Sequence, residues 1–309
     1  MVDKSDASTA AFYAAHPWPG PDAMVSRKWA LRLRPYIREG AFEFLDAGCG
    51  SGQYTAGMLL EYPQARAVAI DLSERSLEDS RSLLRTAGVE DRAEVLCRSF
   101  SDPLPWKDRF DVVIANGSIH HSPDPAVSFV HIAKSMKVGG LLGCMVYGIR
   151  SNARRYEVKE MLHLLTDGDV EEMYKLYSAY DRVYGSIFDK PLRTLIRDAK
   201  LWVGRRLSRW SGKEEQWGYD PRTDHKQVFI DGYAAPIDAA FTSREIQGML
   251  SAAGLELCEM LSGGRSDESV MPAEWVQPWK KLSEWDRIRV SELVTPTPMS
   301  FSFIARRSS

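Results

Sequence analysis

The sequence predicts an α/β fold built on a doubly wound, mostly parallel β-sheet. Short apolar runs alternate with helical patterns between residues 42 and 147, and the same alternation resumes after residue 240. Strands that are buried on both faces of a parallel sheet are nearly continuous in apolar residues, as these runs are. A glycine-rich turn between the first apolar run and the first helical pattern is typical of folds that bind a ligand at the edge of such a sheet.

Length, charge and cysteine content narrow the class of protein. The 309 residues allow one large domain or a domain with an insertion, and a net charge of -2 does not indicate a general nucleic-acid-binding protein. The four cysteines lie far apart, as is typical of reduced thiols in the cytoplasm. The polar N-terminus lacks the apolar core of a signal peptide, and no apolar stretch approaches the ~18 residues of a membrane span. We therefore expect a cytoplasmic protein with no membrane partner.

Residues 1–40 form an N-terminal arm and helix ahead of the sheet. The first ten residues are small and polar, so we expect them to be frayed. Residues 11–20 interleave aromatic residues with prolines, which predicts an ordered arm with a short helix at its start. Residues 23–38 show the spacing of an amphipathic helix.

The core of the fold is expected over residues 41–148. Its strands are predicted at 42–46, 65–71, 93–98, 110–116 and 141–147. Its helices are predicted at 54–61, 73–87 and 125–136, the last of them ending at a turn over 137–140. Ser73 stands where a helix N-cap is needed, and Gly88 stands near the C-terminal end of the same helix.

The alternation of predicted strands and helices stops at residue 148. Residues 149–240 carry helical patterns without strands between them, which predicts a helical cap inserted into the core. Six basic residues and one acidic residue lie between 191 and 209, which fits either a surface for an anionic substrate or a solvated helix face. Residues 241–309 return to the core. They are expected to form a helix to 253 capped by Thr242 or Ser243, a strand at 255–261, a Trp-rich helical segment at 273–294 and a last strand at 299–305.

The glycine-rich turn is the first segment that indicates a bound ligand. Residues 46–52 follow the pattern D-x-G-x-G-x-G, and Gln53 occupies the place where a dinucleotide-binding loop needs its third glycine. Asp71 closes the second strand, 19 residues after Gly52. An acid at this place accepts hydrogen bonds from ribose hydroxyls in nucleoside-binding α/β folds, although an Asp before Ser73 also suits a helix cap.

Residues 44–54 resemble motif I of the class I S-adenosylmethionine (SAM)-dependent methyltransferases, of the type 11/12-like kind. Two further segments resemble the same family: residues 110–125, with F-D-x-V, paired histidines and D-P, and residues 137–142, with a K-x-G-G-x-L turn. The resemblance covers residues 44–147. It implies a seven-stranded Rossmann-like sheet with a reversed last strand, and SAM as the cofactor.

The resemblance also implies which residues meet the cofactor. Glycines of the loop would cradle its amino-acid part, Asp71 would bind the ribose, and Asn116 would lie near the transferred methyl. The family often carries an acid at the position of Ser99, and this chain does not. The expected cofactor-binding residues are Asp46, Gly48, Gly50, Gly52, Asp71, Leu72, Ser99, Phe100 and Asn116.

Candidate groups for the methyl acceptor follow the fourth and fifth strands. An imidazole suits general-base work near neutral pH, so His120 and His121 are candidate catalytic residues together with Tyr147, although a histidine pair at a turn also serves structure. Tyr13, Trp18 and Tyr233 are candidate substrate contacts. The remaining histidines show no metal-ligand spacing, so no metal site is expected.

These observations predict a SAM-dependent methyltransferase that acts on an O, N or C atom of a small-molecule acceptor. A cap of 92 residues would obstruct a large polymer and would exclude water from the reaction. Two alternatives stay open: a tRNA-modifying methyltransferase that uses the basic cap segment, and a SAM-binding protein without catalysis. The sequence does not indicate an oligomeric state.

Overall fold

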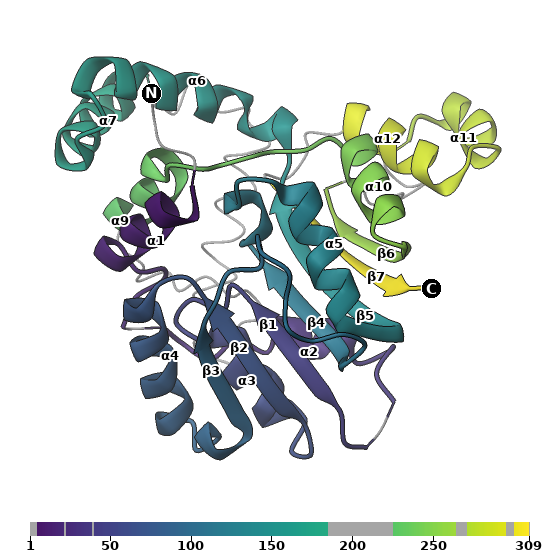
Figure 1. The fold of residues 1–309 in the computed structure, drawn as a ribbon. Coiled ribbons are helices and arrows are strands. Elements are labelled where there is room, and N and C mark those ends of the chain that lie inside the picture. The colour runs from purple at the N-terminus through teal and green to yellow at the C-terminus, as the bar shows by residue number, and fades with distance from the viewer. Residues whose placement is uncertain are drawn as a thin grey trace, which may run out of the picture. The chain divides into compact units, whose positions relative to one another are not determined.

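A seven-stranded sheet forms the centre of the computed structural model (Figure 1), in the order β3-β2-β1-β4-β5-β7-β6. The first five strands run parallel, and β7 pairs antiparallel with both β5 and β6. The strands are β1 Glu43–Ala47, β2 Arg66–Asp71, β3 Ala93–Cys97, β4 Phe110–Asn116, β5 Met136–Tyr147, β6 Leu255–Ser262 and β7 Ser300–Arg307. The predicted α/β fold class, with its mostly parallel sheet and reversed last strand, is confirmed.

The structure describes residues 5–21, 23–38, 40–184, 225–263, 271–294 and 300–308. The chain divides into two compact units, one of Met1–Arg154 with Ala235–Ser309 and one of Arg155–Ala234. The second unit begins six residues later and ends six residues earlier than the insertion expected at 149–240. None of the helices in the described ranges combines the length and the apolar character that a bilayer crossing requires.

Helices cover both faces of the sheet in the first unit. One face packs against α2 Lys28–Leu33, α3 Gln53–Glu61 and α4 Glu74–Thr86, through a buried cluster that includes Trp29, Leu59 and Leu84. The other face packs against α5 Pro125–Ser135, α10 Ser243–Ala252 and α12 Glu284–Val294. Successive strand residues turn to opposite faces, so Phe44 joins the first cluster and Leu45 the second.

The order of the strands in the sheet indicates where a ligand would bind. β1 has β2 on one side and β4 on the other, so the chain reverses its direction of travel across the sheet at the β1–β4 pair. Ligands of open α/β sheets bind in the crevice outside the carboxyl ends of the strands at such a switch point. The glycine loop after β1 and residues 117–121 after β4 both lie at this place.

The N-terminal segment differs from the expectation. Helix α1 spans Asp6–Ala15 and is capped by Ser5 through a reciprocal hydrogen-bond pair with Ser8, so the expectation of a frayed segment is wrong for the described residues from 5 onward. The amphipathic helix expected at 23–38 is only the six residues of α2. Ser26 donates its backbone N–H to the carbonyl of Gln53 and lies against Gly57, which fixes the chain ahead of α2 against α3.

Two other elements start or break where the sequence did not predict it. β5 begins at Met136 directly after α5, because the Gly139–Gly140 turn forms a bulge inside the strand between the pairs Phe110↔Met136 and Val112↔Leu141. The helical segment expected at 273–294 is two helices, α11 Ala273–Lys280 and α12. The expected cap at Ser73 is confirmed, and Thr242 rather than Ser243 caps α10.

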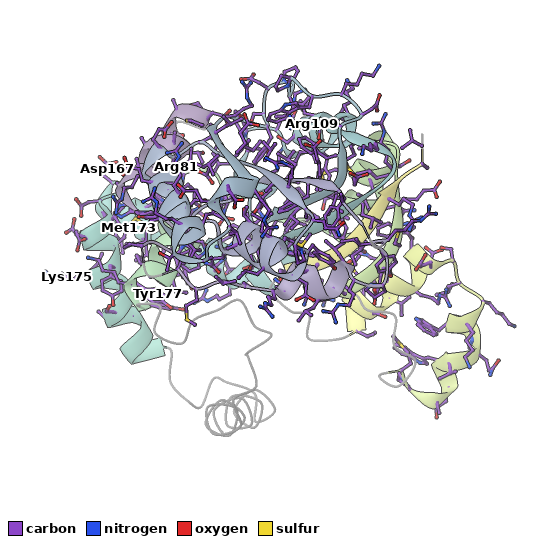
Figure 2. The ribbon with its side chains drawn as sticks, turned by 90° about the horizontal axis from the view of Figure 1, so that it is seen from below. Arg81, Arg109, Asp167, Met173, Lys175 and Tyr177 are labelled. Carbon is purple, nitrogen blue, oxygen red and sulfur yellow. The ribbon has the colours of Figure 1, made fainter. Side chains whose placement is uncertain are left out.

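The second unit is helical where it is described. It contains most of α6 Ile149–Thr166, together with α7 Val170–Tyr184, α9 His225–Phe229 and the π-helical turn η4 Ile230–Ala234. Met173 and Tyr177 lie four residues apart on α7 (Figure 2), and Tyr177 packs on the rings of Phe229 and Tyr233 at centroid distances of 4.8 Å. The basic segment 191–209 lies outside the described residues.

Candidate functional site

The loop after β1 packs closely against other parts of the chain at its glycines. Gly50 and Gly52 adopt φ values of 50° and 80°, in the left-handed region that favours glycine. A Cβ on Gly50 would lie 2.7 Å from the carbonyl oxygen of Trp18, and one on Gly52 would lie 2.5 Å from Oγ of Ser80. Among the described residues no side chain caps α3 at Gly52, so the start of this helix presents backbone N–H groups to an electron-rich ligand.

Asp71 holds the loop from the end of β2. Its carboxylate accepts hydrogen bonds from the backbone N–H of Gly50 and of Ser73, both at 2.9 Å. Burial raises the pKa of Asp71, and these two hydrogen bonds oppose that shift. A carboxylate offers about four lone-pair positions, so acceptor capacity remains for the hydroxyls of a ribose. Leu72 follows it and is half-buried beside the same loop.

Asp46 lies beneath the loop and is almost completely buried. Its carboxylate accepts a hydrogen bond of 2.6 Å from the hydroxyl of Thr55, in the first turn of α3. Burial, with a contribution from the nearby charge of Asp71, raises the pKa of Asp46 to about 7, while the bonds from Thr55 oppose the shift. Asp46 therefore ties β1 to the start of α3, which orients the loop between them.

The loop after β3 is hydrogen-bonded to an acidic residue of α1. Ser99 donates its hydroxyl hydrogen bond to Asp6 of α1, and Ser101 donates to the other carboxylate oxygen of Asp6 at 2.9 Å. The carbonyl of Phe100 is 3.2 Å from Nδ1 of His131 on α5. The carboxylate of Asp6 thus lies beside Ser99, the position at which the resembling family often carries an acid. Sequence reasoning missed Asp6 because it precedes Ser99 by 93 residues, in a segment expected to be frayed.

Asn116, at the end of β4, forms hydrogen bonds with side chains of α2 and α3. Its Oδ1 accepts hydrogen bonds from the indole of Trp29 at 2.9 Å and from the ammonium of Lys28 at 3.2 Å. Its amide donates to the hydroxyl of Tyr54 at 3.2 Å. Burial and, to a smaller extent, the charge of Arg32 lower the pKa of Lys28 to about 8. These contacts give Asn116 a structural role beside the loop, and its contact with a cofactor stays a prediction.

Aromatic and imidazole rings gather after β4 and β5. The turn η2 Ile119–His121 follows β4 and buries both of its histidines. The ring of His120 lies 4.0 Å from that of Tyr147 and 4.2 Å from that of His121, measured between centroids. Tyr13 of α1 meets His121 edge-on at 5.8 Å, and Thr9 of the same helix donates to the carbonyl of His121. The structure therefore brings together four of the six residues expected at the catalytic and substrate sites.

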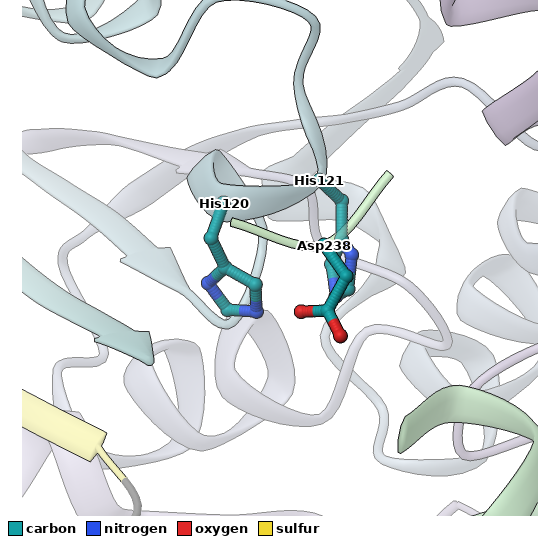
Figure 3. Close-up of side chains that lie close together, drawn as sticks. All are labelled: His120, His121 and Asp238. Carbon is teal, nitrogen blue, oxygen red and sulfur yellow. The ribbon is translucent and has the colours of Figure 1, made fainter. Parts of the chain in front are cut away.

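Asp238 completes this cluster (Figure 3) and was not expected. The backbone around it is fixed against η2, since Ala239 donates to the carbonyl of His120 at 2.9 Å and Nδ1 of His121 lies 2.7 Å from the carbonyl of Ile237. The ligand atoms of the two histidines and Asp238 all lie within 4.8 Å of one another. No local pattern marks Asp238, because the chain between η2 and this segment includes the whole of the second unit.

The other two expected substrate contacts lie apart from these rings. The carbonyl of Trp18 lies against the glycine loop, where it accepts a hydrogen bond of 3.5 Å from Ser51. Tyr233 belongs to the second unit, where it stacks on Phe229. Their contact with a substrate stays a prediction.

Comparisons with known proteins match this chain to methyltransferases. A family model described as a methyltransferase domain matches residues 39–184. An uncharacterised protein from Synechococcus sp. is 26% identical over the whole of this chain, which covers 73% of that protein. A malonyl-[acyl-carrier protein] O-methyltransferase from Bacillus cytotoxicus is 28% identical over 42% of this chain and 45% of its own length. The structure of PKMT2 from Rickettsia typhi in complex with AdoHcy matches with a TM-score of 0.63 and 14% identity, over 87% of this chain and 49% of that one. The chain thus spans about half the length of the last two proteins.

Proposed function

Since the chain contains a class I SAM-dependent methyltransferase domain, we propose that it transfers a methyl group from SAM to an O, N or C atom of a small-molecule acceptor. One observation carries the proposal. The glycine loop and Asp71 stand at the carboxyl ends of β1 and β2, and the ring cluster of His120, His121 and Tyr147 stands at the carboxyl ends of β4 and β5 of the same sheet. A donor site and an acceptor site therefore lie at the same edge of the sheet.

The residues of the donor side fit SAM. The loop over Gly48, Gly50 and Gly52 lets the backbone approach the amino-acid part, and Asp71 retains acceptor capacity for the ribose hydroxyls. Asp46, Leu72, Phe100 and Asn116 border the same loops. At the adenine end, Ser99 acts together with Asp6, whose carboxylate accepts from Ser99 and Ser101.

The residues of the acceptor side position the acceptor and exclude water. SAM supplies an electrophilic methyl group when it is bound, and transfer then depends chiefly on the alignment of the attacking atom. Tyr13, His120, His121 and Tyr147 form a partly apolar wall with polar tips at this edge. The ring contacts hold these side chains against one another, so the wall is set before an acceptor arrives. Trp18 and Tyr233 are further proposed substrate contacts.

A small acceptor fits the observed chemistry better than a polymer. The relative from Bacillus cytotoxicus is named for O-methylation of malonyl-[acyl-carrier protein], and not of a nucleic acid. The candidate catalytic residues His120 and His121 are buried, so a duplex or folded RNA would not reach them. We further propose that the protein acts in the cytoplasm, in line with its four free cysteines.

Incubation of the full chain with methyl-labelled SAM and fractionated cell extract tests the proposed function. We expect label in the low-molecular-weight fraction, and none with Asp71→Asn, which keeps the shape of the side chain and removes its charge. Label in RNA that persists at near-physiological salt would favour the tRNA-modifying alternative. AdoHcy binding without any labelled product would favour a SAM-binding protein without catalysis, and would contradict the proposal.

A further inference from the structure

We propose that His120, His121 and Asp238 bind one divalent transition-metal ion. The three side chains come from two segments that are far apart in the sequence, and their ligand atoms converge within 4.8 Å (Figure 3). Both histidines are buried, and Asp238 is half-buried. This inference departs from the expectation of no metal site, which rested on sequence spacing alone.

The backbone presents Asp238 to the histidines. Residues on either side of Asp238 bond to η2, one through the N–H of Ala239 and one through the carbonyl of Ile237. Further along, Phe241 donates to the carbonyl of Tyr147 at 2.9 Å, which ties the same segment to the end of β5. Asp238 thus lies between anchored neighbours, and this arrangement does not depend on its own side-chain contacts.

The contact between His121 and Ile237 also selects a ligand atom. A carbonyl oxygen can only accept, so Nδ1 of His121 carries the hydrogen and Nε2 keeps its lone pair in the neutral ring. Metal-binding histidines commonly use their second nitrogen in this way, donating to a carbonyl that fixes the ring orientation. His121 therefore already makes the hydrogen bond to a carbonyl that metal-binding histidines commonly make through their second nitrogen.

The distances allow the three groups to close on an ion. Ligands about 2.1 Å from one ion lie roughly 3 to 3.4 Å apart, so closure from within 4.8 Å requires side-chain movements of about 1 Å. Two imidazole nitrogens and one carboxylate oxygen suit Zn²⁺, Fe²⁺ or Mn²⁺ better than Mg²⁺ or Ca²⁺, which prefer oxygen ligands. Three protein ligands leave at least one position open, so the ion would also offer a binding place to an oxygen or nitrogen of a small ligand.

Cobalt binding tests the site without the methyl donor. The full chain is stripped of metal and titrated with Co²⁺, whose visible absorption strengthens when protein nitrogens replace water. We expect one Co²⁺ per chain, displaced by Zn²⁺. Each ligand variant should weaken binding at least about 100-fold, since loss of an outer partner alone costs 10- to 100-fold.

The variants are chosen to keep the fold. His121→Asn retains an N–H donor toward the carbonyl of Ile237, His120→Phe retains the ring contact with Tyr147, and Asp238→Asn retains shape without charge. Melting temperatures measured without metal show whether each variant folds.

Two matched controls accompany them. His163→Asn changes a histidine of the second unit, and Asp124→Asn changes an N-cap to a residue that caps equally well. Both should bind Co²⁺ like the unaltered chain. An unaltered chain whose Co²⁺ spectrum stays that of the aqueous ion, or folded ligand variants that bind as tightly as the controls, would overturn the inference. Because no methyl donor is present, failure of this test leaves the proposed methyl transfer standing, and failure of methyl transfer leaves the metal site standing.

Discussion

Replacing Asp46 by Asn should make the protein more stable at alkaline pH than the unaltered chain. Asp46 is 1% exposed, and burial raises its pKa from 3.8 to about 7. Between these two pH values the folded protein holds a proton on Asp46 that the unfolded chain has lost. A folded-state pKa above the unfolded value contributes stability that is fully present below about pH 4 and is lost as the pH rises through 7.

The size of the effect follows from the shift. One pKa unit corresponds to 1.36 kcal/mol, so the shift of Asp46 amounts to an upper limit of about 4 kcal/mol between pH 4 and pH 8.5. Asn cannot ionise, and its amide oxygen can still accept the hydrogen bond from Thr55. The advantage of the variant over the unaltered chain should therefore grow from pH 5 to pH 7 and stay constant at higher pH.

Urea unfolding at a series of pH values from 5 to 8.5 measures this difference, with tryptophan fluorescence as the signal. Titrating groups that do not interact with Asp46 are common to both proteins and cancel in the comparison. Asp102 is exposed, so Asp102→Asn serves as a control whose difference from the unaltered chain stays constant over the range. A difference for Asp46→Asn that is equally constant, or that favours the unaltered chain at alkaline pH, would refute the reasoning.

Three further predictions concern the loop and the second unit. Asp71→Asn should weaken AdoHcy binding about 10- to 100-fold in calorimetry, through loss of a charged acceptor, and unchanged affinity would remove Asp71 from the cofactor site. Gly52→Ala forces a Cβ to 2.5 Å from Oγ of Ser80 at φ 80°, so the free energy of unfolding should fall by about 1–3 kcal/mol. In the same denaturation assay Gly248→Ala, with open space around the new Cβ, should be neutral or stabilising, and equal effects would contradict the strain argument. Replacing residues 155–234 by a short Gly-Ser linker should spare AdoHcy binding and abolish methyl transfer, and retained transfer would show that the second unit is no part of the acceptor site.

The sheet was predictable because its determinants are local. Each parallel strand is an apolar run in the sequence, and the caps at Ser73 and Thr242 need only residues within one turn. The glycine loop and Asp71 were predictable for the same reason, since a tight turn and a following strand end set their spacing. The extent of α2 was not predictable in this way, because its length depends on a backbone bond between Ser26 and Gln53 that no periodicity reveals.

The rest of the site depends on contacts between distant segments. Asp6 reaches Ser99 and Ser101 from the first helix, and Asp238 reaches the histidines from beyond the second unit. Neither acid stands in a pattern of its own, because its partner is chosen by the packing of whole elements. Asn116 illustrates the same limit, since its position was expected and its bonds to Lys28 and Trp29 were not.

Helix α1 touches both ends of the site at once. Its first residue, Asp6, bonds to the loop after β3, and Tyr13 two turns later rests on His121. A ten-residue helix is about 15 Å long and moves as a rod, so it cannot leave one end without disturbing the other. A movement of α1 would therefore open the cofactor side and the acceptor side of the site together.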